Sequence, residues 1–373
     1  MKKNLLAQIT QYVGTNKEQF LNDWFQLVRM PSVSRTGEGI NECCDWIIAK
    51  MKSLGIAVSK YMLTPSPLIE GRVGSDPAKK TVLIYAHYDV KPAGDLELWN
   101  TPPFEPTVRD GKVYARGSAD NKSPLMAHLE AFSFYKNMGI ELPVNLIFLF
   151  EGCEEEGSRG LPEFLRKNQS RYKADLVFFS DGSKDPGGLP IIALGAKGDL
   201  ALVLKVRTLT KNVHSRYAPV LLSAAWELVE LLNKLKSGNH VNVPGFYDGI
   251  IPPSEKELKI LRELPDSSGQ LEKMYGAEVV LDGKSFYDRL NNTPTFNISM
   301  LKSGADGVVP AAAEAHIDIR LVNGQKPEDI AKKVKDYVFK LGYHNADVFV
   351  NGSIEPSKTD IDTPYLPVIL KRL

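Results

Sequence analysis

Apolar positions in the first half of the chain follow two alternating patterns. Residues spaced three or four apart predict amphipathic helices, which cover residues 17–29, 41–54 and 123–138. Short apolar runs bounded by turn residues or polar clusters are typical of strands buried on both faces, and they cover residues 81–86, 144–150 and 176–179. Gly139 is placed to end the third helix. Strands alternating with helices predict an α/β fold with a parallel or mostly parallel sheet.

The order of elements changes from about residue 198. The pattern there predicts strand, helix, two strands, helix and strand, at residues 199–208, 220–236, 295–300, 314–322, 326–341 and 346–350. This order is that of the split ferredoxin-like unit. The stretch 239–292, rich in proline, glycine and charge, is a long excursion within it. We therefore expect an α+β unit after the α/β half.

Composition narrows the class of protein. A length of 373 residues exceeds what one core usually supports, so two domains are expected. The formal net charge of +1 gives no electrostatic reason to expect nucleic acid or an anionic membrane as partner. The longest apolar run, residues 143–150, is far shorter than a spanning helix, and the N-terminal segment lacks a signal-peptide pattern. Three cysteines without a disulfide framework fit a reducing compartment, which predicts a cytoplasmic location.

Metal-binding residue types follow all three apolar strands of the first half. His87 and Asp89 follow the first, a run of acids from Glu151 to Glu156 follows the second, and Asp181 follows the third. Asp120 adds a carboxylate in a loop just before a helix. Each alone has an ordinary explanation, as a surface pair, a solvated acidic face, a helix cap or a turn. Because open α/β sheets bind ligands beyond the carboxyl ends of their strands, the conjunction favours a metal site. A mixed histidine and carboxylate set indicates zinc, with manganese or cobalt as substitutes.

Four sequence motifs, in this order, carry a family resemblance. They are Tyr85-Ala-His-Tyr-Asp-Val90, Leu98-Trp-Asn-Thr-Pro-Pro-Phe104, Tyr114-Ala-Arg-Gly-Ser-Ala-Asp-Asn-Lys122 and Glu151-Gly-Cys-Glu-Glu-Glu-Gly-Ser158. Through nearly its whole length the chain resembles the dinuclear zinc metallopeptidases. That family includes carnosinases, cytosolic non-specific dipeptidases, aminoacylases, acetylornithine deacetylase and succinyl-diaminopimelate desuccinylase. The tryptophan-containing motif leans toward the dipeptidase branch.

The resemblance implies a role for each matching residue. His87 and Asp181 would bind one metal ion, Glu155 the other, and Asp120 would bridge the two. Asp89 would orient His87, and Glu154 would act as general base. The peptide bond after the bridging aspartate, Asp120-Asn121, would be cis. The implied cofactor is a pair of divalent ions per subunit.

The resemblance also implies a domain plan. Residues 1–196 and 353–373 would form the catalytic domain, and residues 197–352 an inserted ferredoxin-like lid through which the chain forms a homodimer. His214 would reach the neighbouring subunit's site and polarise the substrate carbonyl, while Arg320 would hold the substrate's terminal carboxylate. The other four histidines match no motif and are read as structural: His128, His240, His316 and His344.

The sequence departs from the family pattern in several places. Ser123 and Arg216 stand where glycine is usual, and Gly307 where threonine is frequent. In the family the chain continues after the lid and supplies a substrate loop and a histidine that completes the second metal site, whereas no histidine follows His344 here. We therefore expect a C-terminally truncated dipeptidase whose second ion is underligated and whose activity is weak or absent.

Three functions stay open on the sequence. The first is metal-dependent hydrolysis of dipeptides or small peptides. The second is an N-acyl-amino-acid deacylase or desuccinylase, because the same metal pair serves both reactions. The third is a catalytically impaired member that retains only dimerisation or binding. Two tightly bound ions per chain would favour an enzyme, and one or none the binding protein.

Overall fold

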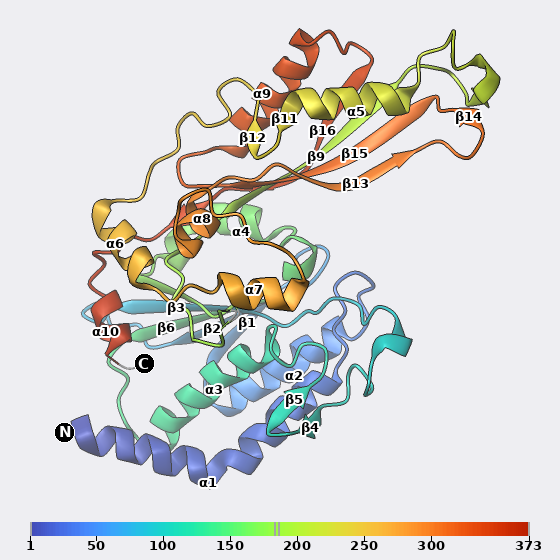
Figure 1. Ribbon diagram of the computed structural model, residues 1–373. Coiled ribbons are helices and arrows are strands. Elements are labelled where there is room, and N and C mark those ends of the chain that lie inside the picture. The colour runs from blue at the N-terminus through green and yellow to red at the C-terminus, as the bar shows by residue number, and fades with distance from the viewer. Residues whose placement is uncertain (1, 183, 186, 372–373) are drawn as a thin grey trace. The chain divides into compact units, whose positions relative to one another are not determined.

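The computed structural model describes residues 2–182, 184–185 and 187–371, with side chains from residue 5 onward (Figure 1). The chain divides into two compact units, Met1–Ser183 and Lys184–Leu373. Among the described residues, no helix has the length and apolar character needed to cross a membrane. The finer division into a catalytic domain with a returning C-terminal segment stays a prediction.

The first unit is built on a five-stranded sheet in the order β1-β2-β6-β3-β7. Its strands are β1 (Ala57–Tyr61), β2 (Leu68–Val73), β3 (Thr81–His87), β6 (Asn145–Glu151) and β7 (Leu176–Phe179). Its longer helices are α1 (Lys2–Arg29), α2 (Ile40–Ser53), α3 (Lys122–Asn137) and α4 (Leu161–Lys167). The α/β class is confirmed, as are the three predicted strands and the three predicted helices, of which α1 begins earlier than expected.

The two faces of the central strand β6 serve two cores. Leu146, Phe148 and Phe150 pack with residues of α1, α2 and α3, whereas Ile147 and Leu149 pack on the side of α4. Successive side chains of a strand point to opposite faces, so a continuous apolar run is what a doubly covered strand requires. The prediction of full burial is confirmed for β6 and for the second half of β3.

The strand directions follow the prediction with one exception. β2 pairs antiparallel with both β1 and β6, whereas β3 pairs parallel with both β6 and β7, so four strands run in one direction and β2 runs against them. The predicted mostly parallel sheet is thus confirmed, and a short connection suffices between β1 and β2 because antiparallel neighbours need no crossover. β7 pairs parallel with β3 at the edge, where Val177 and Phe179 are each 58% exposed, so the expected two-sided burial is wrong for this strand.

The second unit contains a four-stranded antiparallel sheet in the order β13-β15-β9-β16. Its elements along the chain are β9 (Gly198–Arg207), α5 (Ala224–Leu235), β13 (Asn297–Ser303), β15 (Ala312–Leu321), α9 (Pro327–Lys340) and β16 (Ala346–Ile354). This is the predicted β-α-β-β-α-β order, with the first and third strands at the centre of the sheet. The expected ferredoxin-like unit is confirmed.

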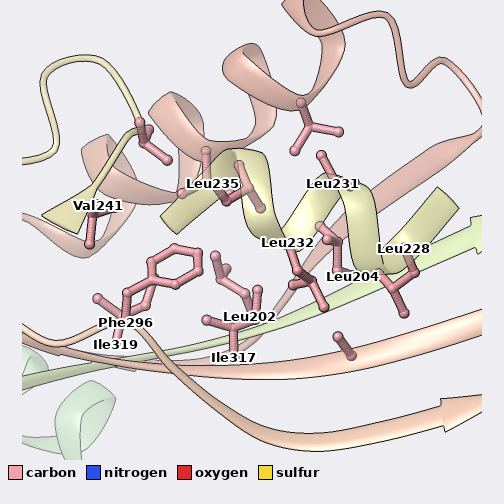
Figure 2. Close-up of a cluster of buried hydrophobic side chains, with 14 of the residues drawn as sticks. Leu202, Leu204, Leu228, Leu231, Leu232, Leu235, Val241, Phe296, Ile317 and Ile319 are labelled. Atoms are coloured by element: carbon pink, nitrogen blue, oxygen red, sulfur yellow. The ribbon is translucent and has the colours of Figure 1, made fainter. Parts of the chain in front are cut away.

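One apolar core joins the helices of this unit to its sheet (Figure 2). Leu228, Leu231 and Leu232 of α5 meet Leu202 and Leu204 of β9 and Ile317 and Ile319 of β15. The α5 residues recur at spacings of three and four, and the strand residues at spacings of two, so each element presents one apolar face. The predicted periodicities therefore correspond to this core.

The excursion between α5 and β13 carries three helices: α6 (Glu255–Glu263), α7 (Ser268–Tyr275) and α8 (Phe286–Asn292). The remaining short elements are β4 (Thr107–Arg109), β5 (Lys112–Tyr114), β8 (Gly195–Ala196), β10 (Val213–His214), β11 (Lys236–Ser237), β12 (His240–Val241), β14 (Val308–Val309), β17 (Ser357–Lys358) and α10 (Leu366–Leu370). α10 lies near the end of the sequence.

Candidate metal centre

Three of the predicted ligands meet at one end of the sheet in the first unit. His87 is the last residue of β3, Asp181 lies two residues beyond the end of the neighbouring strand β7, and Asp120 precedes α3. One ligand atom from each lies within 4.8 Å of the others. His87 Nε2 is 2.9 Å from Asp120 Oδ1 and 3.4 Å from Asp181 Oδ2. Because β3 and β7 run parallel, their carboxyl ends lie at the same edge of the sheet, as the site requires.

Asp89 organises the residues around this cluster from a fully buried position. His87 Nδ1 lies 3.0 Å from the Asp89 backbone carbonyl and 3.4 Å from its carboxylate. Such contacts fix the ring orientation and direct Nε2 toward the carboxylates of the cluster. The same Asp89 carboxylate accepts hydrogen bonds from the backbone N–H groups of Glu154 and Glu155, at 3.0 and 3.1 Å.

Glu154 and Glu155 lie in a short 3₁₀ helix, Glu154–Glu156, after β6. Glu154 Oε2 is 3.9 Å from His87 Nε2, at the rim of the cluster. Burial raises the pKa of Glu154 to about 7, with the negative charges of Asp181 and Glu155 adding to the effect and His87 opposing it. The Glu155 carboxylate contacts Lys91 instead, with Lys91 Nζ 3.5 Å from Glu155 Oε2. Among the described residues, the assembled group is therefore His87, Asp120 and Asp181.

The donor chemistry of this group fits a divalent metal ion. One imidazole nitrogen and two carboxylates are ligands typical of zinc, and carboxylates also suit manganese. Burial disfavours a proton on His87, but the hydrogen bonds to Asp120, Asp181 and Asp89 outweigh it and raise the pKa of His87 to about 12. A cation is therefore strongly favoured at this position, and a metal ion would take the place of the proton.

A second set of contacts connects the ends of β3 and β7, and the sequence did not predict it. The backbone N–H of His87 donates to Asn121 Oδ1 at 3.4 Å, and Asn121 Nδ2 donates to the Ser180 carbonyl at 2.7 Å. The Ser180 hydroxyl lies 2.7 Å from His128 Nε2 on α3. The Asp120-Asn121 peptide is cis, as the resemblance implies. Asn121 could have been suspected from its place beside Asp120, whereas no sequence signal marked His128 or Lys91.

The two predicted substrate-binding residues belong to the second unit. His214 ends β10 and is exposed, with its Nδ1 accepting a hydrogen bond from the Arg216 backbone N–H at 3.2 Å. Arg320 lies on β15, with Nε 3.3 Å from Asp318 Oδ1 and 3.7 Å from Asp199 Oδ1. Their roles stay predictions.

Comparison with known proteins gives a consistent assignment. The model of peptidase family M20/M25/M40 matches residues 83–358. A Cys-Gly metallodipeptidase of Schizosaccharomyces pombe is 29% identical over 91% of this chain and 76% of its own length. The human Beta-Ala-His dipeptidase is 31% identical over 70% of this chain and 55% of its own.

Solved structures agree with the sequence matches. The M20 family metallo-carboxypeptidase Sso-CP2 from Sulfolobus solfataricus has a TM-score of 0.88 at 31% identity, over 94% of this chain and 82% of its own. Human carnosine dipeptidase 1 has a TM-score of 0.78 at 28% identity, over 96% and 82% respectively. With the family model matching most of the chain, and with the Schizosaccharomyces pombe and human sequence relatives both being dipeptidases, this chain is a hydrolase of peptidase family M20/M25/M40, on the dipeptidase branch.

Proposed function

We propose that this protein hydrolyses the peptide bond of dipeptides or small peptides with two divalent metal ions, zinc first, with manganese or cobalt as substitutes. The observation that carries the proposal is the cluster of His87, Asp120 and Asp181, with Glu154 Oε2 3.9 Å from His87 Nε2. The relatives named for Cys-Gly and Beta-Ala-His dipeptides support small peptides as substrates.

In this mechanism His87, Asp120 and Asp181 would hold the first ion, and Asp120 and Glu155 would contribute to the second. When bound, the ions polarise the scissile carbonyl and make water a better nucleophile. Glu154 removes the proton of the attacking water and delivers it to the leaving amine. Asp89 keeps this arrangement in place, because its carboxylate contacts both the His87 ring and the backbone N–H of Glu154.

Arg320 and His214 complete the proposal for substrate binding. Asp318 and Asp199 lie close to the Nε of Arg320, and a guanidinium has two further nitrogens that can pair with a carboxylate in a bidentate manner. Arg320 therefore suits the terminal carboxylate of a peptide. His214 is exposed and polarises the substrate carbonyl in the neighbouring subunit's site.

A homodimer through the second unit is part of the same proposal. Large apolar side chains are exposed on two of its elements, with Trp226 and Val229 on α5 and Ile298, Met300 and Leu301 on β13. Exposed apolar groups of this kind are typical of protein interfaces. The expected cytoplasmic location and the division into catalytic and lid domains remain predictions alongside it.

The deciding experiment measures turnover and metal content together. The purified chain, loaded with Zn²⁺ or Mn²⁺, is assayed for amino-acid release from Cys-Gly and β-Ala-His and for deacylation of N-acetyl and N-succinyl amino acids. We expect dipeptide turnover that falls by about 10² to 10⁴ in Glu154→Ala, with bound metal unchanged. Faster Glu154-dependent turnover of N-acyl substrates would favour the deacylase. Metal-loaded protein without Glu154-dependent turnover of either class would favour the binding protein.

A further inference from the structure

Lys91 places a positive charge beside Glu155, which would be a ligand of the proposed second metal ion. Its Nζ lies 3.5 Å from Glu155 Oε2 and also donates to the Glu155 backbone carbonyl. The Lys91 charge also reaches Asp120, whose pKa is lowered first by the hydrogen bond with His87 and further by Arg116 and Lys91. An ammonium group is a compact point charge on a flexible stem, so it can occupy a cation's place beside a carboxylate.

Within the part of the chain that the structure describes, neither lysine nor arginine forms an ion pair with the ligands of the first metal site. His87, Asp120 and Asp181 already lie with their ligand atoms within 4.8 Å of one another, without Glu155. Their closest ion-pair contacts join them to one another, with His87 Nε2 2.9 Å from Asp120 Oδ1 and 3.4 Å from Asp181 Oδ2. An ion at the second site must instead displace Lys91 from Glu155, or bind beside a like charge. Before any metal ion binds, the Glu155 carboxylate is thus already paired with a lysine, whereas the ligands of the first site contact one another.

Arg116 also brings positive charge near Asp120, but its side chain is fixed elsewhere. Its Nη2 donates to the Pro92 carbonyl at 3.2 Å, and its guanidinium lies 5.6 Å from the centre of the Trp99 ring. Lys91 is half-exposed and makes its ion pair with Glu155. Lys91 is thus the cation whose position depends on whether Glu155 is taken by a metal ion.

We infer that Lys91 acts as a built-in competitor for the second metal ion, so that the two sites fill in sequence, the His87–Asp120–Asp181 site first and the Glu155 site second and more weakly. This inference rests on the proposed two-ion function and adds to it an order of metal loading. The ion pair of Lys91 is with Glu155, so Lys91 acts through that residue.

The test is a titration of the metal-free full chain with Zn²⁺ alone, in competition with a chromophoric chelator and without peptide. We expect two steps for the unmodified chain. Lys91→Gln, which removes the charge and keeps similar length, should tighten the second step by about tenfold and leave the first within about twofold. Glu155→Ala should abolish the second step in both backgrounds.

Lys167→Gln is the matched control. Lys167 pairs with Glu163 on α4 in an exposed ion pair whose acid is not a predicted ligand, so its loss should change neither step. Equal steps in the unmodified chain, a second step that Lys91→Gln does not tighten, or a second step that survives Glu155→Ala would each overturn the inference. Because no substrate is present, these outcomes are independent of the dipeptidase assay that tests the proposed function.

Discussion

The carboxylate of Asp89 accepts a hydrogen bond from the backbone N–H of Glu154 at 3.0 Å. The same carboxylate lies 3.4 Å from the His87 ring. One buried acid therefore connects the predicted ligand at the end of β3 to the turn after β6 that carries the predicted base. Neighbours of metal ligands that orient them in this way commonly affect metal affinity and activity by about 10- to 100-fold.

Asp89→Asn should therefore weaken Zn²⁺ binding at the His87 site by about 10- to 100-fold. The amide keeps the size of the side chain but replaces one accepting oxygen with a donor, which would oppose the N–H of Glu154 or Glu155. Zn²⁺ affinity is measured by chelator competition. Asp45→Asn is the control, because Asp45 is exposed and pairs with Lys60 outside the site. Unchanged affinity in Asp89→Asn would show that Asp89 does not position the ligands.

His128 should influence metal binding through Ser180. Its Nε2 lies 2.7 Å from the Ser180 hydroxyl, next to the ligand Asp181, and burial lowers the pKa of His128 to about 4, so the ring is neutral near pH 7. We expect His128→Leu to weaken Zn²⁺ binding by about tenfold, and His128→Gln, which can keep the hydrogen bond, to restore most of it. If His128→Leu lowers thermal stability but leaves Zn²⁺ affinity unchanged, the role of His128 is only structural.

Ser180→Ala provides a second check on the same contact. If His128 and Ser180 act through one hydrogen bond, the double variant should bind Zn²⁺ about as weakly as either single variant. Additive losses would contradict a shared contact.

Glu70 should make stability depend on pH. Its carboxylate, 2% exposed, accepts hydrogen bonds from Arg72, Arg171 and Tyr172. Burial raises the pKa of Glu70, but these three partners outweigh it and lower the pKa below its usual value. The stabilisation is thus complete above the unfolded pKa of about 4.3 and is lost as the pH falls through the folded pKa.

Glu70→Gln should lower the free energy of unfolding by about 2 kcal/mol at pH 7, with the partial exposure of both arginines limiting the loss. The difference from the unmodified chain should shrink as the pH falls below about 4.3. Urea denaturation at about pH 7 and about pH 3 measures both values. A difference that is the same at the two pH values would exclude an ionised Glu70 as the cause.

Gly152 leaves no space for a side chain. A Cβ atom there would lie 2.5 Å from the ring of Tyr88, which is fully buried and donates from its hydroxyl to the Pro67 carbonyl. Gly152→Ala must displace that ring and should cost about 1–3 kcal/mol. Gly14→Ala is the control, since Gly14 lies within α1 with nothing within 4 Å of its Cβ position, and should stabilise by about 0.5–1 kcal/mol. Equal melting temperatures for both variants would contradict the close packing.

The sequence predicted the elements whose periodicity is set by a single core. The apolar residues at spacings of three and four in α5, and those at alternate positions in β9 and β15, form the core of the second unit. β1 and β2 escaped prediction because Glu70 and Arg72 interrupt the apolar pattern of β2, and only the ion pairs of the folded chain make those charges compatible with burial. Their antiparallel pairing could not be read from spacing at all.

The candidate site likewise contains residues that the sequence predicted and residues that it did not. His87, Asp120 and Asp181 were predicted because each follows or precedes an element that the apolar pattern already located. His128 and Lys91 could not be predicted in this way. The contact of His128 depends on which helix covers the sheet, and that of Lys91 on how the turn after β6 bends back. Such contacts join residues distant in sequence and leave no periodic trace.

Because β7 lies at the edge of its sheet, a bound metal ion should change how readily this strand opens. β7 pairs with β3 alone and ends two residues before Asp181. Edge strands with few buried contacts open locally at low free-energy cost. A metal ion that joins Asp181 to His87 of β3 binds only the closed form, so it stabilises that form by mass action. Amide hydrogen exchange along residues 176–179 should slow when Zn²⁺ is added, which makes the outermost strand a local reporter of metal occupancy.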